Sequence, residues 1–230
     1  MPTIVFASPK GGAGKSTSAV VLAAELARRG AEVVVIDADP NRPVSRWADR
    51  PGRPETLTVL AQATEASIID DIEAAAARVP FVVVDLEGTA SMTVAYAISR
   101  ADLVIVPTQG SQLDAAEAAK AIRLIRQQER AFGRRIPYAV LLTRTSAAIR
   151  PRTLQHIREE MARNDVPVLG TQMHEREAFR AIFSFGGALQ SLNATQVSGL
   201  AAAVKNAQAL AAEIVALLKN AVRETAEATA

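Results

Sequence analysis

The chain has 230 residues, of which 49% are hydrophobic and 22% charged, and its formal net charge is +2. This composition is typical of a globular protein, and the length suits one sizeable domain with a full core. The sequence has no cysteine, which excludes disulfides, thiolate metal sites and cysteine nucleophiles. It also lacks an uninterrupted apolar run of about 18 residues, so we expect no transmembrane helix.

The charge is distributed unevenly along the sequence. Residues 1–119 contain 10 Lys and Arg against 15 Asp and Glu, a net charge of −5, whereas residues 120–180 contain 13 against 6, a net charge of +7. Residues 181–230 contain 3 of each. A basic segment that follows an acidic one favours a polyanion as a partner, although arginines on solvated helix faces are also common.

From the first residues onward, short apolar runs rich in β-branched residues alternate with helical patterns. We predict strands at residues 3–7, 32–37, 57–60, 81–85, 102–107, 136–143 and 166–169. We predict helices at residues 15–29, 65–78, 112–132, 151–164 and 196–224. This alternation predicts an α/β fold with a mostly parallel, twisted sheet and helices on both faces. We expect one domain over residues 1–230, with the last helix packed on the core.

The loop after the first predicted strand reads SPKGGAGKST and has the chemistry of a phosphate-binding loop. Its end, Gly14-Lys15-Ser16, fits the standard pattern G-x-x-x-x-G-K-[ST], but Pro9 stands in place of the first glycine and Lys10 is an additional lysine. Glycines in such a loop let backbone N–H groups approach phosphate, and the following helix contributes its positive dipole end. Lys15 can reach the β- and γ-phosphates, and the Ser16 hydroxyl can bind Mg²⁺.

Carboxylates end two other predicted strands. Asp37 ends the second predicted strand and Asp39 comes two residues later, in the segment VVVIDADP, and Asp85 ends the fourth, in FVVVDLEG. Ligands bind beyond the carboxyl ends of parallel strands, so we expect these side chains to lie near the glycine-rich loop. Carboxylates also cap turns and helices, which is the structural alternative. Three of them at one sheet edge favour a Mg²⁺ site, since this ion takes oxygen ligands and keeps several waters.

The pattern K-G-G-x-G-K-[ST] at residues 10–16, followed by D-x-D-P at residues 37–40, resembles the ParA/MinD family of deviant-Walker ATPases. The resemblance is to the ParA branch and extends over nearly the whole chain. Residues 103–108, 112–114 and 141–144 are similar to segments of small plasmid-partition ParA proteins. Residues 37–43, Trp47 and residues 173–179 are similar to the ParA-like virulence group that assists T-DNA transfer.

The resemblance implies roles for individual residues. Lys10 would be the signature lysine, which reaches across an ATP-sandwich dimer to the partner's phosphates, and Lys15 would be the loop lysine. Asp39 would position or activate the attacking water. Many relatives have D-x-P-P or D-x-x-G where this chain has Asp85-Leu86-Glu87-Gly88, so Glu87 is an alternative to Asp39. The implied metal residues are Ser16, Asp37 and Asp85, and the implied ATP-binding residues are Lys10, Gly11, Gly12, Ala13, Gly14, Lys15, Ser16, Thr17, Arg144 and Met173.

Proteins of this branch bind DNA without sequence preference when dimerised by ATP, through basic residues that contact phosphates. The candidates here are Arg150 and Arg152, which begin a predicted helix, and Arg176 and Arg180, which lie one turn apart if their segment is helical. Other arginines on the helix at residues 112–132 are as compatible with a solvated face.

These inferences predict a Mg²⁺-dependent ATP hydrolase that dimerises on ATP, binds DNA and moves a cargo, with plasmid partition as the leading function. The alternatives are a conjugation or T-DNA-transfer factor and a positioner of protein cargo. We expect a weak activity stimulated by DNA and by a ParB-like or other adaptor protein, in the cytoplasm and on the nucleoid when ATP is bound. A MinD-like membrane-targeted regulator is disfavoured, because residues 221–230 lack a basic amphipathic tail.

Overall fold

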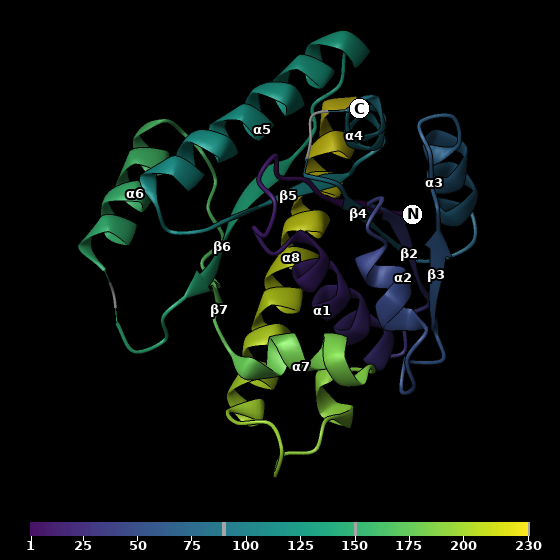
Figure 1. Ribbon diagram of the computed structural model, residues 1–230. Helices are drawn as coiled ribbons and strands as arrows, with labels where there is room; N and C mark the ends of the chain where they lie inside the picture. Colours follow the sequence, from purple (N-terminus) through teal and green to yellow (C-terminus); the bar gives the residue numbers. More distant parts are fainter. Residues whose placement is uncertain (89–90, 150, 230) are drawn as a thin grey trace.

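The computed structural model of the protein describes residues 1–88, 91–149 and 151–229. Within these ranges the strands form one seven-stranded sheet in the order β3-β2-β4-β1-β5-β6-β7, and every pair of neighbours is parallel (Figure 1). The predicted α/β class with a parallel sheet is therefore confirmed. The strands are β1 (Thr3–Phe6), β2 (Val33–Ala38), β3 (Leu57–Ala61), β4 (Phe81–Leu86), β5 (Leu103–Thr108), β6 (Tyr138–Thr145) and β7 (Met173–His174).

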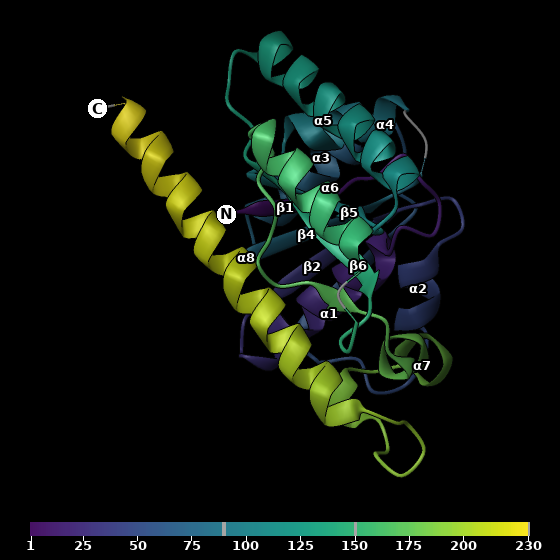
Figure 2. The same cartoon turned by 90° about the vertical axis from the view of Figure 1, so that its left-hand side faces the viewer.

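Helices cover both faces of the sheet, which gives three layers (Figure 2). One face carries α1 (Lys15–Arg28), α2 (Pro43–Ala48), α7 (Glu177–Phe185), the short 3₁₀ helix η1 (Leu189–Ser191) and α8 (Leu200–Thr229). The other face carries α3 (Ile68–Ala76), α4 (Met92–Ser99), α5 (Gln112–Phe132) and α6 (Arg152–Arg163).

The central strands are apolar at nearly every position because both of their faces are covered. In β1, Ile4 and Phe6 pack into the cluster under α1 and α8, whereas Val5 packs into the cluster under α3 to α6. Side chains alternate between the faces of a strand, so a strand buried on both sides needs an unbroken apolar run. This requirement explains why the strand predictions hold best for the middle of the sheet.

The predicted strand at residues 166–169 is wrong. Its only ladder contact among the described residues is a single bridge between Val140 and Val168, and Pro167 there has no N–H to donate. The outermost strand is instead the two-residue β7, which pairs with β6 beyond an irregularity at Arg144, where φ is 51°. A strand of two residues at the edge of a sheet depends on its neighbouring strand, and its own sequence is too short to show a strand pattern.

The helix predictions differ from the structure mainly in their short members and ends. The helices α2, α4 and α7 have six to nine residues each and were not predicted, because so few turns show little periodicity. The last helix begins at Leu200 and not at residue 196. Before it, the Asn193 side chain accepts a hydrogen bond from the Thr195 N–H (2.9 Å), and Gly199 has a φ of 67°, so residues 193–199 form turns.

Helix α8 packs one face against the core beside α1 (Figure 2). By length and composition alone its segment Leu200–Ala221 could also cross a membrane, with a mean hydropathy of 1.4. Its face toward the core carries Ala203, Ala207, Leu210 and Ile214, which are almost completely buried. Packing on the core buries these four side chains, and 28% of the apolar window as a whole is buried.

Candidate nucleotide-binding site

The predicted site elements meet at the carboxyl ends of the central strands. Phe6 at the end of β1 is in register with Asp85 of β4, and Asp85 is in register with Asp37 of β2. The glycine-rich loop follows β1 directly and leads into α1. The parallel sheet thus brings the loop and the two aspartate segments together, as the alternation of strands and helices predicted.

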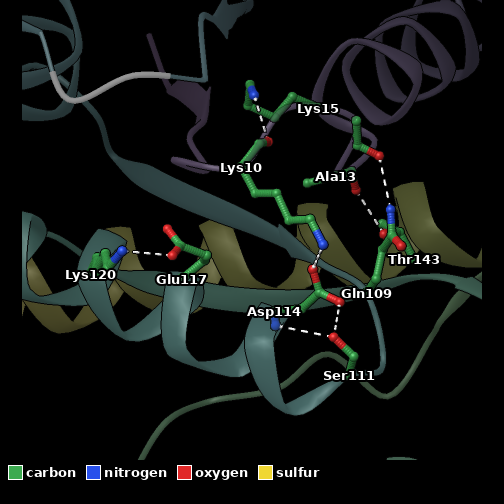
Figure 3. Close-up of polar contacts among 10 residues, drawn as sticks. Lys10, Ala13, Lys15, Gln109, Ser111, Asp114, Glu117, Lys120 and Thr143 are labelled. Atoms are coloured by element: carbon green, nitrogen blue, oxygen red, sulfur yellow. Dashed lines mark hydrogen bonds and ion pairs between the residues drawn. The ribbon is translucent and has the colours of Figure 1, made fainter.

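The glycine-rich loop has a backbone that favours glycine at two positions. Gly12 and Gly14 have φ angles of 73° and 98°, in the left-handed region that other residues rarely adopt. Two side chains from later in the sequence hold the loop: Gln109, just after β5, donates from Nε2 to the Gly12 carbonyl (3.0 Å), and Thr143 of β6 donates from Oγ1 to the Ala13 carbonyl (2.7 Å) (Figure 3). Sequence reasoning did not identify these supports, because they lie more than 90 residues away.

Lys15 lies along the inner side of the loop. Its side chain is buried, and its Nζ donates to the carbonyls of Ser8 (3.2 Å) and Lys10 (3.4 Å). Burial lowers the pKa of Lys15, although the carboxylates of Asp85, Asp39 and Glu87 oppose this shift. A cation in this position can transfer its hydrogen bonds from the loop carbonyls to a phosphate.

Asp85 is a buried carboxylate with little compensation for its charge. It is 0% exposed, and neither of its oxygens lies at hydrogen-bond distance from a partner among the described residues. Burial raises its pKa to about 7 and the charge of Asp37 adds to this rise, whereas the nearby Ser16 hydroxyl and the charge of Lys15 lower it. A buried, unpaired carboxylate is costly, so this group is suited to a cation that binds together with a ligand.

The residues around Asp85 fit a Mg²⁺ ion that is held mainly by phosphate and water. Ser16 lies at the start of α1 beside Asp85 and offers a hydroxyl oxygen. Within residues 1–88, 91–149 and 151–229, no group of three or more His, Asp or Glu side chains could hold a metal ion by itself. Mg²⁺ commonly uses one or two protein oxygens and completes its shell with phosphates and waters.

Asp37 has structural partners that sequence reasoning did not identify. Its Oδ2 accepts hydrogen bonds from both the backbone N–H and the hydroxyl of Ser45, at 2.7 Å each. Its Oδ1 accepts a longer bond from the Asp39 N–H (3.4 Å). Asp37 therefore ties the segment after β2 to the helix α2, and its predicted role near the metal stays a prediction.

Asp39 lies at the turn between β2 and α2 and is half-buried. Its Oδ1 accepts hydrogen bonds from the backbone N–H (2.8 Å) and the side-chain amide (3.0 Å) of Asn41. These bonds orient the carboxylate, and its charge acts on Lys15. Glu87 is also half-buried and acts on Lys15, so the structure leaves both candidates for the water-orienting group near the loop.

Gly88 makes a close approach that the sequence did not indicate. A Cβ atom built on Gly88 would lie 3.2 Å from the Gly11 nitrogen and 3.4 Å from the Gly11 Cα. The segment after β4 therefore packs directly against the backbone of the glycine-rich loop. A side chain at position 88 would push on this loop.

Lys10 does not point toward the loop's own phosphate site. Its side chain extends to the start of α5, where Nζ pairs with the Asp114 carboxylate (Figure 3). Lys15 and Lys10, five residues apart, thus have different environments: the Lys15 side chain is buried, whereas the Lys10 side chain is 40% exposed.

A cavity of about 210 Å³ opens beside the loop. Its lining includes Gly14 and Thr17 from the loop and α1, together with Arg144, Met173 and Arg176. The predicted nucleotide residues Thr17, Arg144 and Met173 are therefore brought together at one cavity. His174 lies there as well, and burial, aided by the charge of Arg176, lowers its pKa.

Of the predicted DNA contacts, Arg176 and Arg180 border the same cavity, and Arg152 lies on another helix. Arg150 lies outside the described residues, and Arg152 is exposed at the start of α6. Arg176 lines the cavity, and its Nε is buried without a hydrogen-bond partner among the described residues. Arg180 also borders the cavity but pairs with Glu175 (2.9 Å) and Glu177 (3.1 Å).

Comparison with known proteins agrees with this geometry. The family model described as VirC1 protein matches residues 1–228. Protein ParA of Rhizobium radiobacter is 44% identical over 223 residues, which cover 97% of this chain and 100% of ParA. Protein virC1 of Rhizobium radiobacter is 33% identical over 187 residues, 79% of this chain and 80% of virC1.

A solved structure shows the same fold. It is a putative plasmid partition protein from Borrelia burgdorferi bound to AMPPNP, with a TM-score of 0.69 and 18% identity, and the match covers 93% of this chain and 98% of that one. The fold is thus that of the P-loop NTPases of the ParA/MinD type, as the resemblance of the glycine-rich loop and of the D-x-D-P segment implied. The chain belongs to the VirC1 family of ParA-like proteins.

Proposed function

We propose that the protein is an ATP hydrolase that dimerises on ATP, binds DNA without sequence preference and uses this cycle to segregate or position a cargo. The observation that carries the hydrolase is the buried, unpartnered carboxylate of Asp85 beside Ser16, at the base of a loop with two lysines. A bound cation would compensate the negative charge of Asp85, and a bound phosphate would compensate the positive charges of the lysines.

The chain's own residues supply the parts of phosphoryl transfer. Loop N–H groups and the start of α1 hold the phosphates, and Lys15 turns from the loop carbonyls to the phosphate oxygens. Ser16 and Asp85 would hold a Mg²⁺ ion, which would neutralise charge on the phosphates when bound. Asp39 orients the attacking water, and Lys10 of one subunit acts on the nucleotide of its partner, as an arginine finger does.

The cavity beside Gly14 is the proposed base site. It adjoins the loop where the sugar of a nucleotide would leave the phosphates, and Arg144 and Met173 are in its lining. Arg144 has a left-handed backbone (φ 51°) at the irregularity between β6 and β7. The planar guanidinium group of Arg144 would stack on the adenine ring.

Plasmid partition and DNA transfer are two alternative processes that this protein could serve. The 44% identity to a ParA protein over all of its length favours plasmid partition. The VirC1 family match over residues 1–228 favours a role in DNA transfer. A Lys15→Ala allele tested for plasmid retention and for conjugative transfer in the same strain separates them, because only the process that the protein serves would fail.

The biochemical proposal is tested by measuring oligomeric state and DNA binding in three nucleotide states. Size-exclusion chromatography and gel shifts on two unrelated duplexes are run with ATP, with ADP and without nucleotide. We expect a dimer and a shift only with ATP, equal on both duplexes and weaker at higher salt. Lys15→Ala abolishes both. Equal DNA binding in all three states, or binding insensitive to salt, would overturn the proposal.

A further inference from the structure

The pair formed by Lys10 and Asp114 joins the glycine-rich loop to helix α5. The two residues are 104 positions apart in the sequence, and Lys10 Nζ contacts Asp114 Oδ1 directly (Figure 3). Asp114 lies in the first turn of α5. Its backbone N–H donates a hydrogen bond to Oγ of Ser111, the N-cap residue of that helix (3.2 Å). The Ser111 hydroxyl also contacts Asp114 Oδ2.

Asp114 differs from an ordinary surface carboxylate. Its side chain is only 4% exposed, and both of its oxygens are engaged, one by Lys10 and the other by Ser111. Burial alone would raise the pKa of Asp114, but the hydrogen bonds from Lys10 and Ser111 outweigh it and hold the pKa below its usual range. A buried anion with a single cationic partner depends strongly on that partner.

A second ion pair on the same helix offers a comparison. Lys120 pairs with Glu117 at 2.6 Å, three residues apart on the surface of α5, with side-chain exposures of 56% and 29% (Figure 3). This pair links two residues of one helix and is typical of exposed pairs that contribute little. The Lys10–Asp114 pair, in contrast, links the site loop to another element.

We propose that Asp114 is a positioning residue that holds Lys10 within its own subunit and so opposes dimerisation until ATP-bound subunits meet. This inference rests on the proposed function, in which Lys10 acts on a partner's phosphates. The γ-phosphate of the partner then competes with Asp114 for the same ammonium group. Two such pairs must open for each dimer, one in each subunit.

The competition sets the size of the expected effect. A hydrogen bond to a charged group contributes enough to shift an equilibrium by roughly tenfold or more. Because two pairs open, a tenfold effect per subunit becomes about a hundredfold in the dissociation constant of the dimer. Removing the Asp114 charge should therefore make the ATP-dependent dimer tighter by up to this factor.

The pair itself is tested first, without nucleotide and independently of any ATPase activity. The intact protein is treated briefly with an amine-acylating reagent, and mass spectrometry compares the modification rate of Lys10 with that of the exposed Lys205. We expect Lys10 to be protected in the wild type and to react several-fold faster in Asp114→Asn. The matched control Glu117→Gln should leave Lys10 unchanged. Equal Lys10 rates in wild type and Asp114→Asn would overturn the pair in solution.

The consequence for dimerisation is tested by a double-mutant cycle. Sedimentation velocity with ATP and Mg²⁺ gives the dimer dissociation constant of wild type, Asp114→Asn, Lys10→Ala and the double variant. We expect Asp114→Asn to tighten the dimer and to have no effect when Lys10 is already replaced. Ser111→Ala keeps the Asp114 charge but leaves Lys10 as the remaining side-chain partner of this carboxylate, so it should not tighten the dimer.

The outcomes separate this inference from the proposed function. A wild-type protein that never dimerises with ATP would contradict the proposed function and leave the acylation result to stand on its own. A weaker dimer in Asp114→Asn would overturn the inference and would mean that Asp114 supports Lys10 in the dimer. Equal effects of Asp114→Asn with and without Lys10 would also overturn the inference, because Asp114 would then act independently of Lys10.

Discussion

Asp37 and Asp85 are direct register partners on the adjacent parallel strands β2 and β4, yet their carboxylates have opposite environments. Asp37 accepts two 2.7 Å hydrogen bonds from Ser45. Asp85 accepts none from the described residues, although both aspartates are almost completely buried. Two identical residue types at one edge of the sheet thus have different functions: Asp37 orders the chain around the site, and Asp85 remains available to a ligand.

The first prediction is that Asp85→Asn stabilises the nucleotide-free protein at alkaline pH. The pKa of Asp85 is raised from 3.8 to about 7, so the folded state bears the cost of a buried charge once the pH exceeds this value. The unfolded carboxyl ionises around its ordinary pKa of 3.8 and the folded one around 7, so the cost of the buried charge grows between these pH values, is complete above pH 7 and vanishes only well below pH 3.8. Urea unfolding in EDTA should show a gain on the order of 2 kcal/mol at pH 8 and almost none at about pH 3.

Its control is Asp37→Asn, which weakens the bonds to Ser45 and should lower the free energy of unfolding at pH 8. The Asp85→Asn variant should also lose ATP hydrolysis, because it no longer offers a charged ligand to Mg²⁺. An Asp85→Asn protein that is less stable than the wild type at pH 8 would contradict the unpaired state of this carboxylate.

The second prediction concerns the close approach of Gly88 to the glycine-rich loop. Gly88→Ala places a methyl group 3.2 Å from the Gly11 nitrogen, so the loop backbone must shift. We expect ATP affinity, measured by calorimetry, to fall roughly tenfold, since phosphate binding depends on accurately placed N–H groups. Gly133→Ala is the control: it strains the end of α5, where φ is 63°, and should reduce stability by about 1 kcal/mol while ATP affinity is unchanged.

The third prediction separates Asp39 from Glu87 as the group that orients water. Asp39 is held by Asn41, which fixes its direction, and we expect Asp39→Asn to lower the single-turnover rate of hydrolysis about a hundredfold. Glu87→Gln should lower it less than about threefold. ATP binding, measured in parallel, should persist in both variants. The reverse order of the two rates would assign the role to Glu87.

The fourth prediction compares two arginines proposed to bind DNA. Arg152 is exposed at the start of α6, whereas Arg180 is neutralised by Glu175 and Glu177. Arg152→Ala should weaken ATP-dependent DNA binding equally on unrelated duplexes and reduce the slope of log K against log salt by about 1. Arg180→Ala should change the slope much less. If Arg180→Ala has the larger effect, its ion pairs must open on DNA.

The class of fold and the sheet edge that carries the candidate site follow from local sequence patterns. Unbroken apolar runs require burial on both faces, and their alternation with helices makes the strands parallel, so the loop and Asp85 had to end at the same edge. Local chemistry also makes Lys15 and Ser16 candidates for binding phosphate and Mg²⁺, because a strand, a glycine-rich turn and a helix are the elements of a phosphate-binding loop. These predictions depend on neighbouring residues, which is why they were possible.

The contacts of the side chains at that edge, in contrast, follow from the folding of the whole chain. The partner of Lys10 is Asp114, 104 residues away, and the neighbour of Gly88 is Gly11. The outermost strand is β7 and not residues 166–169, because pairing at the edge of the sheet depends on which backbone N–H and C=O groups of β6 are available. Such contacts join residues distant in sequence through packing of the whole sheet and its helices, and no local pattern specifies them.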